Sequence, residues 1–285
     1  FQAEDGIRDS VASRGLGDVY KRQEKNNFRG VLIGSSGGID SALTAAIAYD
    51  ALGKGRVKTI MMPFDFTADI SIEDAGSLAK NLGIEHSEIS IKEMYESFSL
   101  ALKESFEGMG IDKTEENLQS RCRGVTLMAL SNKLGFLVLT TGNKSEAAVG
   151  YSTLYGDTAG GFSVLKDVSK TLVYELANYR NSLSVVIPKR IIERPPSAEL
   201  APDQKDTDSL PDYDRLDPII EMYVEDDKSI QEIINEGFDE KEVRRIVSLI
   251  DFNEYKRRQA PLGIKISDRN FGKDRRYPIT NSWKP

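Results

Sequence analysis

Short apolar runs alternate with longer amphipathic stretches along the first half of the chain. The runs at 31–33, 57–62, 84–89 and 136–139 end near Gly, Pro or polar residues, as buried strands do. Amphipathic helices are predicted at 40–52, 71–82, 92–106 and 115–134. The order β, α, β, α, β, α, α, β predicts an α/β fold, with a doubly wound parallel sheet and helices on both faces. Ligands of such sheets bind at the carboxyl ends of the strands.

Two of the predicted helices carry finer signals. Ser71 and Asp74 are spaced as in a capping box, and Gly83 is placed to end the same helix. The longest helix is predicted to bury one apolar face, made of Leu118, Cys122, Val125, Met128 and Ala129. A lone cysteine on such a face is expected to pack as a small hydrophobe.

The second half of the chain is less regular. The stretch 193–213 carries four prolines and is predicted to be a loop, with helices near 217–235 and 239–257 and an irregular tail after Pro261. Residues 193–242 hold 17 acidic and 5 basic side chains, whereas residues 256–285 hold 9 basic and 2 acidic ones. A basic tail of this kind suits an anionic substrate or the acidic stretch of a neighbouring subunit.

Composition narrows the classes of function. The chain has 285 residues, with 38 Lys and Arg against 45 Asp and Glu, and its formal net charge is −7. An acidic balance argues against a duplex-DNA binder, and one Cys with one His argues against a disulfide framework or a Cys- or His-rich metal centre. No apolar run reaches the roughly 18 residues of a membrane helix. We therefore expect a cytoplasmic protein with small-molecule substrates and with neither nucleic acid nor membrane as a partner.

The amino-terminal end reads differently from the rest. Residues 1–23 show no sustained apolar period and no signal-peptide core, and the run RDSVASRGLGDVYKRQ resembles a translated sequencing adapter. We expect residues 1–23 to be a non-native or linker segment and residues 24–285 to form one domain. We also expect the native amino terminus to be missing.

The most informative segment joins the first predicted strand to the first predicted helix. It reads Gly34-Ser35-Ser36-Gly37-Gly38-Ile39-Asp40-Ser41. Adjacent glycines let backbone N–H groups approach an anion, and the start of a helix favours negative charge, so the loop is predicted to bind phosphate. Ser36 and Ser41 offer hydroxyls to phosphate oxygens. An acid at Asp40 suits phosphate only where it holds a bridging Mg²⁺.

Residues 36–41, SGGIDS, match throughout the SGGxDS signature of the N-type ATP pyrophosphatases. Further segments resemble the NAD synthetase family, in particular the synthetase domain of its glutamine-dependent members. They are 116–121 (ENLQSR), 139–146 (LTTGNKSE), 149–157 (VGYSTLYGD), 195–200 (PPSAEL), 253–261 (NEYKRRQAP) and 274–279 (DRRYPI). The resemblance covers about residues 27–285.

This resemblance implies an adenine nucleotide alpha hydrolase-like fold and a ligase that forms a C–N bond. In the family, ATP adenylates the carboxylate of nicotinic acid adenine dinucleotide and releases pyrophosphate, and ammonia then displaces AMP to give NAD⁺. ATP and Mg²⁺ are the implied cofactors, and a homodimer or larger homo-oligomer is implied. Glutamine-dependent members carry a nitrilase-like glutaminase domain upstream. We expect that this domain is missing here and that the chain uses free ammonia.

The resemblance also assigns functional residues by position. ATP binding falls to Gly34, Ser35, Ser36, Gly37, Gly38, Ile39, Asp40, Ser41, Thr141, Lys170 and Ser197. Dinucleotide binding falls to Asn117, Arg121, Glu146 and Lys256, the first two often supplied by a neighbouring subunit. Asp40 and Glu146 are the implied metal ligands, and together with Asp157 they are the implied catalytic acids.

Alternatives remain open at this point. The chain departs from the family at Ser35, where a leucine is usual. Lys170 also suits a solvated lysine at the start of a helix, and Glu146 a carboxylate that complements a helix dipole. A different SGGxDS enzyme that amidates or thiolates another acceptor, such as a GMP synthetase-like one, is the nearest rival. A nucleotide-binding module without catalysis is the second, although the pair Asp40 and Glu146 argues against it.

Overall fold

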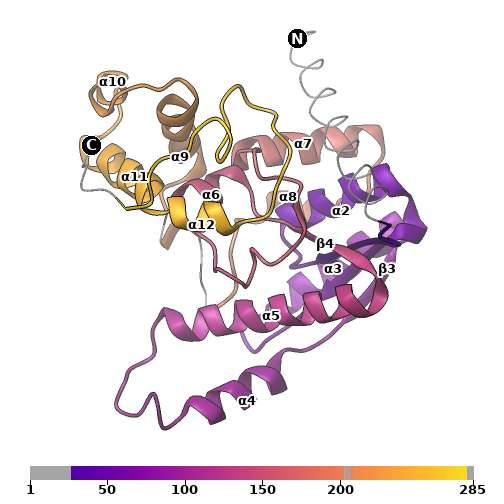
Figure 1. Ribbon diagram of the computed structural model, residues 1–285. Coiled ribbons are helices and arrows are strands. Elements are labelled where there is room, and N and C mark those ends of the chain that lie inside the picture. The colour runs from indigo at the N-terminus through magenta and orange to yellow at the C-terminus, as the bar shows by residue number, and fades with distance from the viewer. Residues whose placement is uncertain (1–26, 202–203, 205, 209, 281–285) are drawn as a thin grey trace.

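A five-stranded parallel sheet organises the protein (Figure 1). The computed structural model describes residues 27–201, 204, 206–208 and 210–280, so the expected linker at 1–23 lies outside the described residues. The strands are β1 (Gly30–Gly34), β2 (Val57–Met61), β3 (Glu85–Glu88), β4 (Phe136–Thr140) and β5 (Phe162–Ser163). Their order is β3-β2-β1-β4-β5 and every neighbouring pair is parallel. The predicted doubly wound sheet is therefore confirmed.

Helices cover both faces of the sheet. The helices of the described part are α2 (Ile39–Leu52), α3 (Asp69–Leu82), α4 (Lys92–Leu102), α5 (Lys113–Leu134), α6 (Lys144–Val149), α7 (Lys170–Leu183), α8 (Lys189–Glu193), α9 (Tyr213–Ile220), α10 (Ile230–Asn235), α11 (Glu240–Phe252) and α12 (Glu254–Gln259). Two 3₁₀ turns, η1 (Lys54–Arg56) and η2 (Asp206–Asp208), and a π-helix, η3 (Glu221–Glu225), also lie in the described part.

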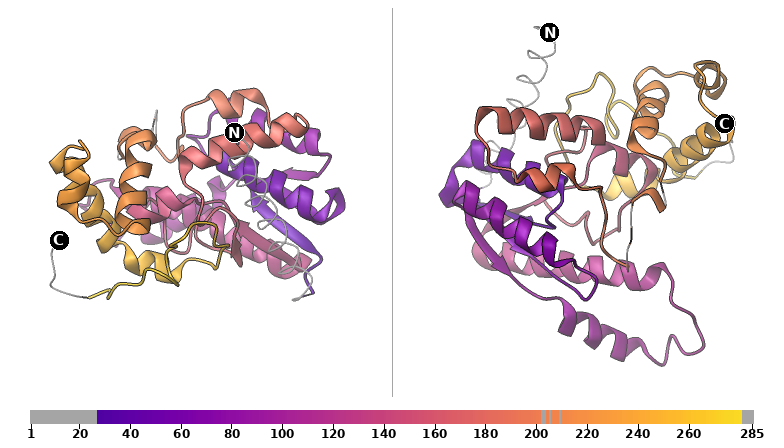
Figure 2. Two further views of the ribbon diagram at one scale, coloured as in Figure 1. Left: turned by 90° about the horizontal axis from the view of Figure 1, so that it is seen from above. Right: turned by 180° about the vertical axis from the view of Figure 1, so that it is seen from behind.

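Alternation along the central strand builds two of the three apolar cores. Val31 and Ile33 of β1 pack with buried residues of α2, α3 and α7, whereas Leu32 packs with Cys122 and Leu127 of α5. This is the period-2 pattern of a strand buried on both faces. A third apolar core joins α6, α9, η3 and α11 at the end of the molecule opposite β3 (Figure 2).

The sheet topology decides where a ligand fits. The connections after β1 and β4 leave these adjacent strands in opposite directions, because β2 and β3 lie on one side and β5 lies on the other. A crevice opens at such a point, outside the carboxyl ends of the two strands. The segments that follow β1 and β4 carry the predicted phosphate loop and the predicted Thr141–Glu146 contacts, so topology brings them together.

The prediction for α5 is only partly right. Cys122 is buried, but Val125 and Met128 are 61% and 38% exposed. The inward face carries polar residues instead, among them Gln119 and Ser120. The reason is that this face of α5 looks onto a cavity and not only onto the sheet. α4 lies on the outer side of α5 and buries none of its residues; it ends at Leu102, before the predicted position 106 (Figure 1).

The capping box predicted at Ser71 is wrong. α3 begins at Asp69 after Ala68, and no side chain caps it. The Ser71 hydroxyl donates instead to Glu199 at 2.6 Å, and Asp74 pairs with Arg190 at 2.8 Å. Tertiary partners that are more than 100 residues away have overridden the local pattern. Gly83 does end α3, with a left-handed backbone.

The two carboxyl-terminal helices are each broken. Around 217–235, α9 contains Pro218 and runs into η3, and Asp227 turns the chain at φ 59° before Ser229 caps α10. Around 239–257, Asn253 separates α11 from α12 by donating to the Val149 carbonyl at 2.9 Å. The loop at 193–213 is confirmed over its described residues, apart from η2. β5, α6, α7 and α8 were not predicted as elements.

Candidate functional site

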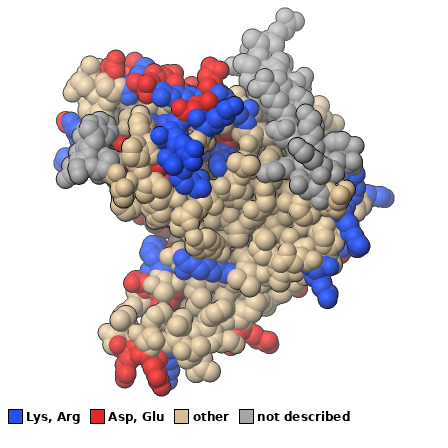
Figure 3. Space-filling view, viewed as in Figure 1, with Lys and Arg blue, Asp and Glu red and all other residues tan. Residues whose placement is uncertain are grey.

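A cavity of about 620 Å³ opens at the carboxyl ends of β1 and β4. The segments 34–41 and 139–143, the inward face of α5, the loop 150–159, the segment 194–200 and α12 contribute to its lining. Figure 3 shows a recess between the arm formed by α4 and α5 and the rest of the molecule, with Lys and Arg side chains beside it. The size fits a drug-sized ligand or larger.

The glycine loop after β1 is held in one conformation. Gly37 has φ 75°, and a Cβ atom there would lie 2.3 Å from the Ser71 carbonyl oxygen. The Ser36 and Ser41 hydroxyls lie 3.2 Å apart, and the Ser36 N–H donates to Ser41. These hydroxyls, predicted to meet phosphate, therefore brace the loop itself. Gly38 precedes α2 without any side-chain cap, which leaves the first N–H groups of α2 for an anion.

A buried lysine joins two of the predicted acids. Lys170 Nζ lies 2.5 Å from Asp40 Oδ2 and 3.4 Å from Glu146 Oε1, and only 2% of the residue is exposed. The alternative of a solvated lysine is therefore wrong. Burial opposes the charge on Lys170, yet Asp40, Glu146 and Asp206 together raise its pKa. Burial raises the pKa of Glu146, and the positive charge of Lys170 opposes this rise.

Sequence reasoning missed Asn143, which fixes both acids. Its Nδ2 donates to Asp40 Oδ1 at 2.9 Å, and its Oδ1 accepts the Glu146 N–H at 2.9 Å. Asn143 and Glu146 form the capping box of α6. The spacing N-x-x-E in Gly142–Glu146 carries that signal, and it was available in the sequence.

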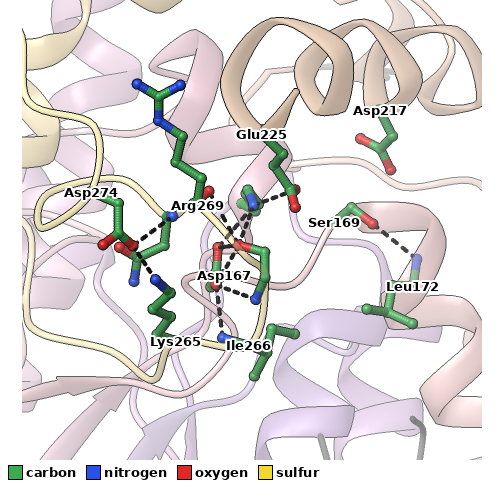
Figure 4. Close-up of polar contacts among 12 residues, drawn as sticks. Asp167, Ser169, Leu172, Asp217, Glu225, Lys265, Ile266, Arg269 and Asp274 are labelled. Atoms are coloured by element: carbon green, nitrogen blue, oxygen red, sulfur yellow. Dashed lines mark hydrogen bonds and ion pairs between the residues drawn. The ribbon is translucent and has the colours of Figure 1, made fainter. Parts of the chain in front are cut away.

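A second buried cluster lies behind α6 (Figure 4). Lys144 Nζ is 2.9 Å from Asp167 and 2.6 Å from Glu225, and it donates to Ser267 at 2.9 Å. Asp167 also accepts the Ile266 and Ser267 N–H groups. The cluster pins the carboxyl-terminal segment 263–275, here called the strap, against the start of α6.

Asp217 provides a test of pH dependence. It accepts hydrogen bonds from Ser145 and from the N–H and hydroxyl of Thr171. Burial nevertheless raises its pKa above the ordinary value. The native state then binds more protons than the unfolded state, so this carboxyl makes the free energy of unfolding fall as pH rises from about 4. We expect the Asp217→Asn variant, which keeps the size and one of the two acceptor oxygens, to lose this fall. Urea unfolding of both proteins between pH 4 and 7 measures it, and parallel curves would contradict the assignment.

Asn117, Asp157 and Lys256, three more of the predicted residues, lie on another part of the cavity wall. Asn117 accepts from the Thr153 hydroxyl at 2.7 Å, and Asp157 accepts the Thr153 N–H at 3.0 Å. Lys256 donates to the Gly150 and Ser152 carbonyls at 2.7 and 2.8 Å. Burial lowers the pKa of Lys256, and Asp157 opposes that effect.

Arg121 is the exception among the predicted residues. It is exposed, donates to the Leu154 carbonyl at 3.3 Å and is not part of the cavity lining. In one copy of the chain, Asn117 therefore lies in this lining and Arg121 lies outside it. The remaining predictions, Ser35, Thr141 and Ser197, all line the cavity.

The lining residues that escaped prediction include Arg123, Arg194, Glu199 and Asp206. Arg194 and Glu199 pair at 2.5 Å, and both contact Ser71 beside the glycine loop. Asp206 accepts from Tyr213 at 2.9 Å. No local pattern marks them, because each acts through a partner on another element.

Carboxylates near Lys170 are the candidate ligands for a divalent cation. Among the described residues no group of three or more Asp, Glu, His or Cys is arranged to hold a metal ion. Asp40, Glu146 and Asp206 nevertheless place three carboxylates around the single charge of Lys170. This acidic surplus fits Mg²⁺, which is commonly held by one or two carboxylates together with substrate phosphates.

Comparisons with known proteins point to one family. The family model for NAD synthase matches residues 16–260. A glutamine-dependent NAD(+) synthetase of Acinetobacter baylyi is 56% identical over 264 residues, which are 92% of this chain and 49% of the relative. The chain thus spans about half the length of the curated relatives it matches. No helix in the described part is long and apolar enough to cross a membrane.

Two solved structures share the fold. The glutamine-dependent NAD⁺ synthetase of Acinetobacter baumannii, in complex with ADP, matches with a TM-score of 0.64 and 49% identity over 96% of this chain and 50% of that one. The NMN synthetase of Francisella tularensis matches with a TM-score of 0.74 and 29% identity over 87% of this chain and 95% of that one.

Proposed function

Because this chain belongs to the NAD synthase family, we propose that it is the synthetase part of a glutamine-dependent NAD⁺ synthetase. It uses ATP to adenylate nicotinic acid adenine dinucleotide and lets ammonia displace AMP. The observation that carries the proposal is the arrangement of Asp40, Lys170 and Glu146 beside an uncapped helix start in a large cavity. An ADP complex of a relative that is 49% identical supports ATP as the nucleotide.

The chain's own residues divide the work between the two ends of the cavity. The N–H groups at the start of α2 hold phosphate oxygens, and Lys170 supplies a cation beside them. Asp40 and Glu146 are the residues that would hold Mg²⁺, which supplies charge neutralisation at the phosphates when bound. Asn143 keeps both carboxylates oriented.

At the other end, the dinucleotide carboxylate must reach the α-phosphate. Lys256 uses two of its three N–H donors on backbone carbonyls, and the third is left for an anionic group of the substrate. Asp157 is held by Thr153 and Ser120 within the same wall. Closing the two substrates into one enclosed cavity supplies proximity and excludes water from the adenylate.

An endpoint assay of the purified chain tests the proposal. ATP, Mg²⁺ and nicotinic acid adenine dinucleotide are combined with ammonium in one tube and glutamine in another. A third tube replaces the dinucleotide with nicotinic acid mononucleotide, because a relative of known structure is an NMN synthetase. We expect NAD⁺ and AMP with ammonium only. A folded sample that forms no NAD⁺ in either tube that contains the dinucleotide would refute the proposed function.

Replacing Lys256 with Ala tests which end binds the dinucleotide. We expect the KM for the dinucleotide to rise by roughly 10-fold or more, and the KM for ATP to change little, since a charge-assisted hydrogen bond is lost at one end only. Lys241→Ala, an exposed change on α11, is the matched control. An effect confined to ATP would reverse the assignment.

The partners follow from the same proposal. Glutamine-dependent relatives are about twice as long as this chain, and a glutaminase region joined to the synthetase part would deliver ammonia to the cavity. The exposed position of Arg121, outside the lining, suits a homo-oligomer in which it serves a neighbouring copy.

A further inference from the structure

Arg123 of α5 is a cation of the cavity wall that the proposed reaction does not use. Its Nε donates to the Met62 carbonyl at 3.0 Å, and no described carboxylate forms an ion pair with it. Its Nη groups make no hydrogen bond to the described residues and, unlike Nη1 of Arg194, they are not sealed from solvent. Arg123 is one of the residues that line the cavity. Burial lowers the pKa of Arg123 to about 10, so the side chain stays charged at neutral pH.

Apolar residues lie close to the contact between Arg123 and Met62. Gly34, Met61, Met62 and Leu127 line this part of the cavity, here called the slot. A Cβ atom at Gly34 would lie 3.2 Å from Leu127 and 3.4 Å from Met62, so both side chains close in on the end of β1. A slot with apolar walls fits a flat group better than a phosphate, because charged phosphate oxygens are costly to desolvate beside such walls.

The slot adjoins the phosphate loop directly. Gly34 ends β1 and begins the loop that continues to Ser41. A nucleotide whose phosphates lie at the start of α2 can extend its sugar and base over Gly34 towards Met62. The cation available to it there is Arg123.

The chemistry of a guanidinium fixes what it can bind. Arginine offers five N–H donors and no acceptor. One donor is engaged by Met62, so the free Nη edge needs an oxygen or nitrogen lone pair from a ligand. The ribose oxygens and the ring nitrogens of adenine supply such acceptors.

Resting on the proposed function, we propose that Arg123 binds the nucleoside of ATP in this slot, with Nε on Met62 and Nη on a ribose or base acceptor. The planar fork is required for both contacts at once. A lysine, which is a point charge on a flexible stem, does not replace it.

Direct titration of ATP into the whole chain tests the proposal without turnover. We expect Arg123→Met to raise the Kd for ATP by about 10- to 100-fold and Arg123→Lys to recover little of that loss. Lys133→Met, an exposed change on the same helix, should leave the Kd unchanged. The Kd for nicotinic acid adenine dinucleotide should stay within about 3-fold. An unchanged Kd for ATP, or a larger change for the dinucleotide, would overturn the assignment.

Analogues of ATP locate the acceptor. The wild-type protein is titrated with 2′-deoxy-ATP, 3′-deoxy-ATP, 1-deaza-ATP, 3-deaza-ATP and 7-deaza-ATP beside ATP. We expect one analogue to bind the wild type more weakly than ATP does. The Arg123→Met variant should bind that analogue and ATP with equal affinity. If no analogue separates the two proteins, the contact is not to the nucleoside and the proposal fails.

The two proposals fail in different ways. A wild type that binds ATP but forms no NAD⁺ defeats the proposed function, and the titrations still decide on Arg123. A wild type that forms NAD⁺, together with an Arg123→Met variant of unchanged ATP affinity, defeats the inference alone.

Discussion

An Asp40→Asn variant is expected to lose AMP formation by at least about 1,000-fold while remaining folded. The change removes one negative charge from the group that surrounds Lys170 and takes away a proposed Mg²⁺ ligand. The amide keeps the size of the side chain and an oxygen that accepts from Asn143. Lys170 retains Glu146 as a partner, so no buried charge is left alone.

The measurement is AMP release in the ammonium assay, beside a thermal melt of the same sample. Asp50→Asn is the matched control, because Asp50 lies on the same helix and pairs with Arg180 away from the cavity. We expect the control to keep its turnover. Turnover within 10-fold of wild type in Asp40→Asn would show that the carboxylate is not part of the chemistry.

The second large effect is expected on stability, from Lys170→Met. Removing the cation leaves Asp40 and Glu146 facing each other in a buried site, and breaking a buried pair in this way costs roughly 3–5 kcal/mol. Adding Asp40→Asn to Lys170→Met removes one of the two opposed charges. We therefore expect the double variant to be more stable than the sum of the single changes predicts, by about 1–3 kcal/mol.

Urea unfolding of the wild type, both single variants and the double variant closes this cycle. The same cycle on Asp50 and Arg180, an ion pair nearer the surface, should give less than about 1 kcal/mol. If the changes in the free energy of unfolding at Lys170 and Asp40 are additive, their contact contributes no electrostatic coupling.

The fold could be predicted from the sequence because it depends on local patterns of residues. The runs at 31–33 and 136–139 are apolar throughout, as strands buried on both faces must be, and Gly37 and Gly38 mark a backbone that approaches an anion. These features need no knowledge of distant partners. The order of elements and the loop of the candidate site therefore followed from them.

The errors have the opposite origin. The alternative of a solvated Lys170 fails because the partners of this lysine lie 130 and 24 residues away. Ser71 and Asp74 have the spacing of a cap, yet Glu199 and Arg190 take their side chains. Val125 is exposed for a similar reason, because the inward face of α5 lines a cavity and carries polar residues. Pairings of this kind are set by tertiary structure, and single-chain periodicity does not contain them.

The strap has a consequence for how the protein is made. Residues 263–275 leave the ribosome after every strand of the sheet, so the sheet can form while the segment that engages Lys144 and Asp167 is still being synthesised. During that interval Lys144 and Asp167 have each other and Glu225 but lack Ser267. The contacts of Ser267 with Lys144 and Asp167, which hold the strap against the start of α6, can therefore form only after all five strands have been synthesised.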